Sequence, residues 1–303
     1  MGRPPRIFED DPEPQPFLKW AGGKGQLLTA LAGRMPPEVQ GYHEPFVGGG
    51  ALFFDLVRRG AIRGEARLAD VNPTVIATWR AVRDDVEAVI EHLRALDAAH
   101  DPYEPGPGYY AARDRFNALR GVASTERAAL MIYLNRTGFN GLYRENSSGL
   151  FNVPVGAYKN PNIVRAASLR ATSRALQGVE IEVRPFDEGL LDRARPGDFV
   201  YFDPPYEPLN ATSFFTAYSK DGFTGDDQRR LAVLFEELTR RGVLCMLSNS
   251  TAPLILALYE EMAARLPVRV DRVGARRFIN SKADSRGEID EVVVVNCSLL
   301  DRS

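Results

Sequence analysis

The residues best suited to chemistry are Asp203-Pro204-Pro205-Tyr206, which directly follow the apolar run at residues 199–202. A carboxylate and an aromatic ring at the end of a buried strand can hold a flat nitrogen heterocycle, because the ring stacks on its face while the oxygens accept its amino protons. The two prolines donate no hydrogen bond to a sheet, but they make a stiff exit that fixes the backbone carbonyls. The pattern favours a purine or pyrimidine base as ligand, although the same residues also suit an ordinary turn.

A glycine cluster, Gly48-Gly49-Gly50, lies between Glu44-Pro45-Phe46 and an apolar segment with helical periodicity. Glycines at such a turn let a cofactor approach the backbone. The spacing lacks the third glycine of a dinucleotide site and the Lys-Ser/Thr pair of a phosphate loop, which weakens both readings. About 20 residues further on, Asp70 ends a second predicted strand, where an acid can hold ribose hydroxyls. S-adenosylmethionine, an adenosine-bearing cofactor without a pyrophosphate, fits these features, although glycine turns before helices are common.

A basic block interrupts an otherwise acidic chain. Residues 109–174 hold ten Lys/Arg against three acids, a local excess of seven positive charges in a chain whose net charge is −2. Such a block suits phosphate neutralisation, but it is also typical of a solvated arginine-rich helix. Within it, residues 146–149 predict the tip of a hairpin with arms at 142–144 and 150–153. A ribbon of this kind fits the major groove of DNA, where arginine can bind two atoms of guanine and an apolar side chain can act as a wedge.

The composition limits the class of protein. With 303 residues, 44% of them hydrophobic and 26% charged, the chain can bury one large core and an inserted subdomain. It shows no run of about 18 apolar residues and no basic-then-apolar start, so we expect neither a membrane span nor a secretory signal, and a cytoplasmic location. Cys245 and Cys297 lack metal-ligand spacing, and the three histidines form no catalytic or metal-binding pattern, so no metal site is predicted.

The elements that must position these residues indicate an α/β fold. Strands are expected near residues 41–46, 66–70, 179–184, 198–203 and 243–248. Helices are expected at 25–33, 73–97 and 225–241, and residues 268–273 and 289–299 resemble a closing antiparallel pair. Residues 1–16, rich in proline and acids, predict a disordered arm. We divide the rest into a catalytic, cofactor-binding domain at 17–100 and 176–303 and a target-recognition insertion at 101–175, which begins near a Pro/Gly break.

Five motifs, taken in order, resemble those of the Dam-type DNA adenine-N6 methyltransferases, also called the D12 class. They are the run from Phe17 to Lys24, Glu44-Pro45-Phe46 with its glycines, Asp70-x-Asn72, the run from Asn135 to Arg144, and Asp203 to Tyr206. The resemblance spans nearly everything from Phe17 to Asn296. It implies a Rossmann-like S-adenosylmethionine-dependent methyltransferase sheet with an inserted helical and β-hairpin DNA-recognition region. It also implies site-specific methylation of adenine N6 in duplex DNA by base flipping.

The resemblance also implies roles for individual residues. Catalysis would fall to Asp203, Pro204, Pro205 and Tyr206, with Pro204 lending its carbonyl to the target amine. Phe186 would flank the cofactor adenine and Asp70 would take the ribose hydroxyls. The full cofactor-binding set is Trp20, Lys24, Phe46, Gly48, Gly49, Gly50, Asp70, Phe186 and Asp203. The positions that match base-reading residues are Lys19, Phe139, Asn140, Leu142 and Arg144, and they predict GATC as the recognition site. Arg136, in the same motif, is a further candidate for DNA binding.

The expected chemistry follows from the weakness of an adenine amine as a nucleophile. Two acceptors, the Asp203 carboxylate and the Pro204 carbonyl, would hold that amine in a more pyramidal form, and no covalent intermediate is needed. Cytosine-C5 methylation typically uses a Pro-Cys pair, whereas Leu244 precedes Cys245 and Asn296 precedes Cys297. The alternatives are methylation of an RNA adenine or a protein amide, and a catalytically inactive DNA-binding protein. The expected partners are double-stranded DNA and, in a restriction-modification pair, a separately acting endonuclease.

Overall fold

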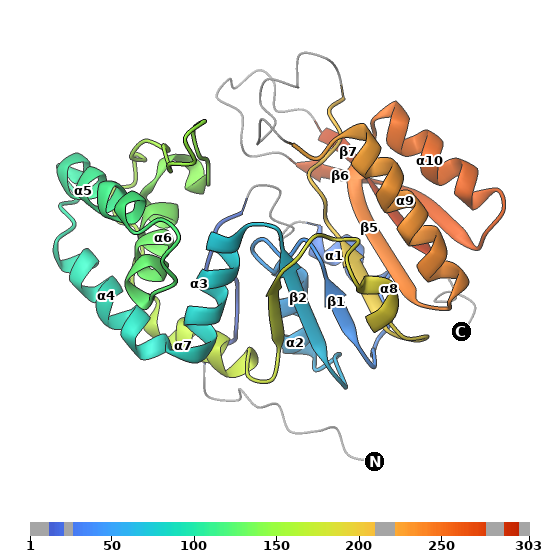
Figure 1. Ribbon diagram of the computed structural model, residues 1–303, viewed down its shortest axis with the longest axis horizontal. Coiled ribbons are helices and arrows are strands. Elements are labelled where there is room, and N and C mark those ends of the chain that lie inside the picture. Colours follow the sequence, from blue (N-terminus) through green and yellow to red (C-terminus); the bar gives the residue numbers. More distant parts are fainter. Residues whose placement is uncertain (1–11, 21–26, 210–221, 277–287, 297–303) are drawn as a thin grey trace. The chain divides into compact units, whose positions relative to one another are not determined.

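The computed structural model describes residues 12–20, 27–209, 222–276 and 288–296 (Figure 1). Its internal contacts divide the chain into two compact units. The helical unit comprises Met1–Gly23, Gly48–Gly60 and Asn72–Ile181, and the sheet unit comprises Lys24–Val47, Ala61–Val71 and Glu182–Ser303. Each unit is therefore assembled from segments that are far apart in the sequence.

The sheet unit contains seven strands in the order β3-β2-β1-β4-β5-β7-β6. β1 pairs in parallel with β2 and with β4, and β4 with β5, whereas β7 is antiparallel to β5 and to β6. The strands are β1 (Tyr42–Glu44), β2 (Ala66–Asp70), β3 (Glu180–Val183), β4 (Phe199–Phe202), β5 (Leu244–Ser250), β6 (Val268–Arg276) and β7 (Glu288–Asn296). This order is doubly wound, so the predicted α/β fold class and the closing antiparallel pair are both confirmed.

The strand order reverses between β1 and β4, and open α/β sheets bind their ligands at the carboxyl ends of strands at such a switch point. Glu44 ends β1 and Phe202 ends β4. Phe202 is in register with Leu247 of β5, but β5 continues to Ser250, which is in register with Glu291 of β7. The polar end of β5 thus extends past the last residue of β4, where the chain leaves the sheet.

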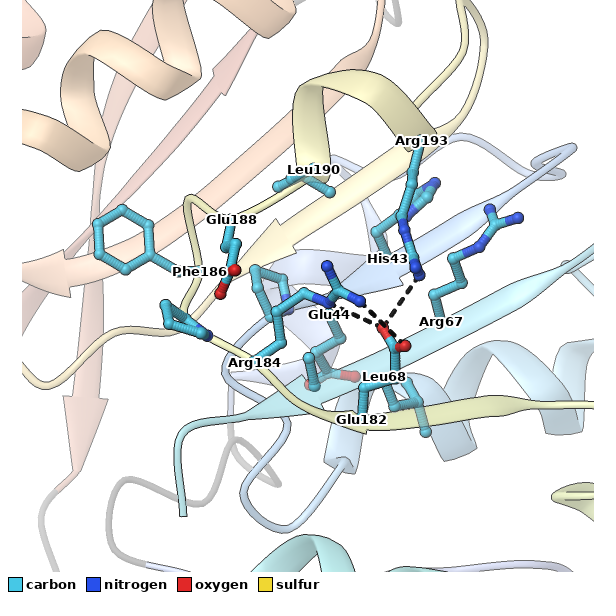
Figure 2. Close-up of a pocket in the computed structure, with 13 residues that line it drawn as sticks. His43, Glu44, Arg67, Leu68, Glu182, Arg184, Phe186, Glu188, Leu190 and Arg193 are labelled. Atoms are coloured by element: carbon cyan, nitrogen blue, oxygen red, sulfur yellow. Dashed lines mark hydrogen bonds and ion pairs between the residues drawn. The ribbon is translucent and has the colours of Figure 1, made fainter. Parts of the chain in front are cut away.

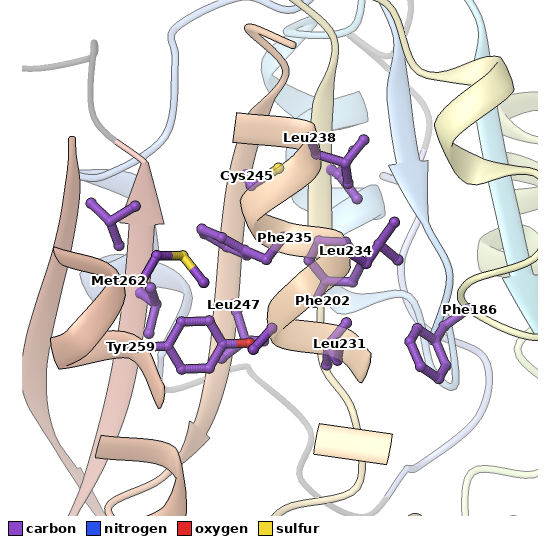
Figure 3. Packing of buried hydrophobic residues seen from close by; sticks show 14 of the residues in the cluster. Phe186, Phe202, Leu231, Leu234, Phe235, Leu238, Cys245, Leu247, Tyr259 and Met262 are labelled. Carbon is purple, nitrogen blue, oxygen red and sulfur yellow. The ribbon is translucent and has the colours of Figure 1, made fainter. Parts of the chain in front are cut away.

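Helices α9 (Gly225–Arg240) and α10 (Pro253–Ala263) supply much of the core of the sheet unit (Figure 3). Leu231, Leu234, Phe235 and Leu238 recur at helical spacing along α9 and are buried. Phe235 packs edge-on against Tyr259 of α10, with ring centroids 5.6 Å apart. Each fully buried side chain of this size contributes about 1.5–3 kcal/mol relative to exposure. α9 is therefore held firmly on the sheet, which matters because its first turn carries polar side chains.

The first turn of α9 is closed by a capping box, in which the Thr224 side chain accepts from the Asp227 amide and the Asp227 carboxylate accepts from Thr224. This confirms the helix start predicted near residue 225. Two shorter helices of the sheet unit are α1 (Leu28–Ala32) and α8 (Leu190–Arg193). Among the helices that the structure describes, none is long and apolar enough to cross a membrane.

In the helical unit three helices, α3, α4 and α5, pack against α6, whose residues 127–135 are all buried. Its helices are α2 (Ala51–Arg59), α3 (Pro73–Asp84), α4 (Val86–Ala98), α5 (Pro105–Ala118), α6 (Thr125–Thr137), the 3-10 turn η1 (Phe139–Gly141) and α7 (Ala166–Ala175). The single helix predicted at 73–97 is wrong: the chain breaks at Asp85, with φ −147°, and restarts as α4. The Asp85 side chain accepts a hydrogen bond from the Ala88 amide and so caps the start of α4. In a continuous helix it could not make this bond.

Candidate active site

The segment Asp203-Pro204-Pro205-Tyr206 follows β4 at the switch point of the sheet. β4 is buried throughout, because Phe199, Val200, Tyr201 and Phe202 lie in the middle of the sheet. Asp203 and Tyr206 are half-buried, Pro204 is buried and Pro205 is exposed. The chemistry-bearing side chains therefore lie at the boundary between core and solvent, as a binding site for a bulky ligand requires.

Side chains from α9 and β5 hold this segment by its backbone. Gln228 Nε2 donates to the Pro205 carbonyl at 3.0 Å, and Asn249 Nδ2 donates to Gln228 Oε1 at 3.1 Å. Asn249 Oδ1 accepts from the Glu207 amide at 3.1 Å, and Ser250 Oγ donates to the Glu207 carbonyl at 2.6 Å. Gln228, Asn249 and Ser250 are all buried, so these bonds are shielded from water. Sequence reasoning missed all three residues, whose only signal is that they are polar within apolar elements.

The Pro204 carbonyl differs from its neighbour. Within the described residues, no group donates a hydrogen bond to it, whereas the Pro205 carbonyl is occupied by Gln228. Pro204 is a buried residue, and most backbone carbonyls of buried residues have a hydrogen-bond donor. The segment therefore presents one open backbone acceptor next to the Asp203 carboxylate in the chain.

Tyr42, Tyr201 and Tyr206 lie close to Asp203 at the same strand ends. The Tyr206 hydroxyl donates to Glu291 Oε2 at 2.5 Å, and the Tyr42 hydroxyl donates to Glu44 Oε2 at 2.8 Å. Burial, followed by the nearby Asp203 carboxylate, raises the pKa of the Tyr206 phenol well above its usual value. The phenol stays protonated at neutral pH, so Glu291 anchors the Tyr206 ring in one orientation.

Three phenylalanines of the sheet unit lie together near the ends of β1 and β3. Phe46 and Phe186 stack with ring centroids 5.4 Å apart and planes inclined by 22°, and Phe223 lies 5.5 Å and 5.4 Å from the two. Asp70 ends β2, and its carbonyl accepts from the Arg184 amide at 3.1 Å. The fold thus brings the predicted cofactor residues Phe46 and Phe186 into direct contact, where they form one aromatic wall.

Phe186 also lines a pocket formed by β1, β2 and residues 182–193 (Figure 2). Glu182 accepts from Arg184 Nε at 2.9 Å and from Arg193 Nη1 at 3.0 Å, as the dashed lines show. The whole lining carries three arginines, Arg67, Arg184 and Arg193, against three glutamates, Glu44, Glu182 and Glu188. The charges around the pocket are therefore balanced and give no sign of a strong anion site.

The glycine loop belongs to the helical unit and is shaped by two tryptophans. Gly48 and Gly50 have positive φ angles of 44° and 64°. A Cβ at Gly48 would lie 2.5 Å from Trp20, and a Cβ at Gly50 would lie 2.4 Å from Trp79, whose Nε1 donates to the Gly48 carbonyl at 3.0 Å. Only glycine fits both the backbone and the space here. Lys24, the remaining predicted cofactor residue of the first motif, lies outside the described residues.

The predicted hairpin is confirmed. Glu145 and Phe151 form an antiparallel bridge, and Gly149 at the tip has φ 70°. The Asn117 side chain of α5 binds both the amide and the carbonyl of Phe151, at 2.8 Å and 3.1 Å, so the hairpin is fastened to a helix. Tyr143 is buried and stacks on Trp20 with centroids 6.0 Å apart. Part of the hairpin is therefore buried against the rest of the helical unit.

Four of the five predicted base-reading residues lie in this hairpin or in the turn η1 just before it. Phe139, Asn140 and Arg144 are exposed, and Leu142 is half-buried. Asn140 has φ 54°, a left-handed conformation that asparagine tolerates better than most residues. Arg144 Nε donates to Asn152 Oδ1 at 2.7 Å, so its guanidinium is oriented before any ligand binds. Sequence reasoning placed Asn152 in the hairpin arm but missed this supporting role.

Lys19 and Arg136 are held differently. The Lys19 amide donates to Asn135 Oδ1 at 2.6 Å, and the Lys19 ammonium lies 4.3 Å from the centre of the Tyr158 ring. Burial, together with the charge of Arg136, lowers the Lys19 pKa. Arg136 donates to the backbone carbonyls of Phe17 and Asn162, and burial lowers its pKa to about 10. Arg136 therefore ties separate segments of the helical unit together, whatever it contributes to binding.

The residues that the structure describes include no group of three or more His, Cys, Asp or Glu side chains suited to a metal ion. His43 instead forms a buried pair with Asp198, with 3.2 Å between Nε2 and Oδ2. Burial is the main cause that lowers the His43 pKa, so the imidazole is neutral near pH 7. This pair supports the fold at the start of β4.

Known proteins are similar to this chain over most of its length. Residues 20–273 match the family model described as D12 class N6 adenine-specific DNA methyltransferase. A Type II methyltransferase of Lactococcus lactis subsp. cremoris is 40% identical over 93% of this chain and 95% of its own length. A Type II methyltransferase of Methanocaldococcus jannaschii is 40% identical over 94% and 99%, and the DNA adenine methylase of Escherichia coli K12 is 35% identical over 92% and 94%. The resemblance that the motifs suggested is thereby confirmed, and the chain belongs to the D12 class of adenine-specific DNA methyltransferases, a family whose reaction implies the use of S-adenosylmethionine.

Proposed function

We propose that this enzyme methylates N6 of an adenine that it flips out of duplex DNA, at the sequence GATC. The observation that carries the proposal is the place of two acceptors directly after β4, namely the Asp203 carboxylate and the neighbouring Pro204 carbonyl. Both lie at the switch point of the sheet, where such folds bind ligands. Membership of an adenine-specific family supports adenine N6 as the target.

The two acceptors would activate the amine. The lone pair of an adenine amine is conjugated with the ring, and acceptors on its N–H groups hold the nitrogen in a more pyramidal, more nucleophilic form. Bound S-adenosylmethionine supplies the electrophilic methyl group. The N6 amine would take this methyl group, the electron pair of the broken carbon–sulfur bond would stay on sulfur, and one proton would leave N6. Asp203 would stabilise the positive charge that develops on N6 before that proton departs to solvent, while the anchored Tyr206 ring stacks on the base.

The glycine loop supports a site for such a cofactor. Trp20 and Trp79 leave no room for a side chain at Gly48 and Gly50, so the loop backbone carries none that would cover it. We assign the ribose hydroxyls to Asp70, the adenine to Phe186, and the methionine and ribose side to Phe46 and Gly48-Gly49-Gly50. Trp20 and Lys24 would border the cofactor, and Asp203 would lie between the cofactor and the target base.

Sequence recognition is assigned to the exposed face of the hairpin. Arg144 would bind guanine O6 and N7 together, and Phe139, Asn140 and Leu142 would contact bases or fill the gap that the flipped adenine leaves. Lys19 and Arg136 complete the proposed contacts. Two relatives are named Type II methyltransferases, and for this reason we include a separately acting restriction endonuclease as a proposed partner.

The test is to expose unmethylated DNA to the purified enzyme and S-adenosylmethionine and to sequence the methylated bases. We expect N6-methyladenine within GATC, and Asp203→Ala should abolish transfer while DNA binding persists. Asp226→Ala is the matched control, because that carboxylate is 89% exposed on α9 and is ion-paired with Arg229. Labelled methyl appearing in RNA or protein, or full activity of Asp203→Ala, would overturn the proposal, and another DNA sequence would overturn GATC alone.

A further inference from the structure

Two buried side-chain amides connect the segment Asp203-Pro204-Pro205-Tyr206 to the core of the sheet unit. Gln228 is 1% exposed and Asn249 is 0% exposed, and they come from different elements, α9 and β5. Their hydrogen bonds form an unbroken chain from the Pro205 carbonyl through both amides to the Glu207 amide. Burying two amides costs free energy unless their polar atoms are paired. The folded state therefore depends on these hydrogen bonds.

The direction of every bond in this chain is determined by the backbone groups at its ends. The Pro205 carbonyl can only accept, so the Gln228 amide nitrogen must point toward it. Gln228 Oε1 must then accept from the Asn249 amide nitrogen. That leaves Asn249 Oδ1 to accept from the amides of Glu207 and Ser250, both of which can only donate. One arrangement satisfies all the groups, and flipping either amide would place like atoms together.

The segment depends on these side chains because its own backbone offers little to hold it. Pro204 and Pro205 have no N–H, so a strand-like ladder cannot continue through them. The bonds from Gln228 and Asn249 both fall just after Pro204 in the chain, one on the Pro205 carbonyl and the other on the Glu207 amide. A shift of the segment would move the Pro204 carbonyl and the Asp203 carboxylate together.

We infer that Gln228 and Asn249 are positioning residues for methyl transfer: they occupy the Pro205 carbonyl and the Glu207 amide and so hold Asp203 and the Pro204 carbonyl in the geometry that the target amine requires. This inference rests on the proposed role of Asp203 and Pro204. Misplacement of reacting groups by about 1 Å can reduce a rate by about 100-fold. Neither amide touches the reacting atoms. Substitution of either residue should therefore lower kcat and leave the KM values for DNA and for S-adenosylmethionine nearly unchanged.

Gln228→Glu tests the inference, since the new carboxyl is nearly the same size and can still accept from Asn249. When ionised it cannot donate to the Pro205 carbonyl, and when protonated it can. Burial raises the pKa of such a carboxyl, so its protonated form becomes populated as the pH falls toward about 6. We expect kcat, relative to wild type at the same pH, to be about 100-fold low at about pH 8.5 and to recover toward about pH 6. Gln228→Ala should be equally low at every pH.

The matched control is Gln177→Glu, because Gln177 also donates to a backbone carbonyl, that of Arg83, but is exposed in the helical unit. It should behave as wild type. The charged residues next to Gln228 in α9 are Asp226, Asp227, Arg229 and Arg230, and the other segments that meet there carry Asp203, Glu207 and Glu291. These charged groups are the same in Gln228→Glu and Gln228→Ala. The ratio of the two variants' kcat values at each pH therefore reports on residue 228 alone.

The outcomes separate the two proposals. The inference is supported if Gln228→Glu has a low kcat that recovers at low pH and KM values that match those of wild type. Its melting temperature should be close to that of Gln228→Ala. Wild-type activity of both Gln228 variants, or a loss without pH recovery, overturns it, while an inactive Asp203→Ala still upholds the proposed function. An active Asp203→Ala overturns the proposed function and the inference with it. Asn249→Ala provides a second variant, for which the same kcat loss with intact KM is expected.

Discussion

Arg144 illustrates how a single side chain can be prepared for recognition. Its guanidinium is exposed on the hairpin and is oriented by the Asn152 side chain at 2.7 Å, with a second bond to the Asn152 carbonyl at 3.4 Å. A preoriented guanidinium loses less freedom on binding than a mobile one. Arg144 can therefore contribute to sequence choice without a large entropic cost.

Arg144→Ala is expected to relax or abolish discrimination for GATC while cofactor affinity stays nearly constant. A bidentate contact to guanine is worth about 1–3 kcal/mol, so the preference for cognate DNA should fall by roughly 10- to 100-fold. Competition between cognate and altered duplexes measures this, and calorimetry measures the cofactor affinity. Arg115→Ala removes the same charge from an exposed arginine paired with Glu126, and it should leave the preference unchanged. Equal loss of preference in both variants would contradict the assignment.

Helix α2 shows how one element depends on glycine at its two ends for different reasons. Gly50 and Gly60 flank it as caps, both in the left-handed region, with φ 64° and 63°. A Cβ at Gly60 would meet nothing within 4 Å, whereas a Cβ at Gly50 would lie 2.4 Å from a ring atom of Trp79. Trp79 is fully buried, so its ring cannot easily move away.

Gly60→Ala should therefore cost only the left-handed backbone penalty, about 1–2 kcal/mol. Gly50→Ala should lower the free energy of unfolding by more than this, because overpacking adds about 1–3 kcal/mol, and it should also weaken cofactor binding. Urea unfolding and calorimetric titration with S-adenosylmethionine check the two effects. Equal unfolding free energies for the two variants would show that Trp79 yields to the added methyl group.

At the scale of the whole molecule, charge is separated along the chain. The excess of seven positive charges at residues 109–174 falls entirely within the helical unit, so the remainder of the chain carries a net negative charge. Some of these cations are already paired, as Arg115 is with Glu126 and Arg170 with Glu87. A net charge near zero thus conceals a strongly basic segment suited to phosphates.

DNA affinity is consequently expected to fall steeply with salt, with each neutralised phosphate contributing about 0.9 to the slope of log K against log salt. Cofactor affinity should change little over the same range. Fluorescence anisotropy with a labelled duplex and calorimetry with the cofactor measure the two quantities. A DNA affinity that does not respond to salt would contradict a role for the basic segment.

The sequence by itself determined several of the elements and predicted where the candidate site lies. The apolar run before Asp203, the Thr224 capping signal and the Asn-Ser-Ser-Gly tip each act within a few residues, so β4, α9 and the hairpin were predictable. The aspartate and tyrosine of the proposed catalytic segment were recognisable for the same reason. Their assigned functions remain predictions.

Only the tertiary structure decided which groups support that site. Gln228 and Asn249 are 21 residues apart, and their bond exists because α9 packs on β5. Asp85 divides a helix that periodicity alone would continue, and Arg136, expected on DNA, binds backbone carbonyls of its own unit. Periodicity and capping are short-range, whereas the partner of a buried polar group is set by the packing of distant segments. The bond from Gln228 to the Pro205 carbonyl, next to the proposed catalytic acceptors, is a result of that packing.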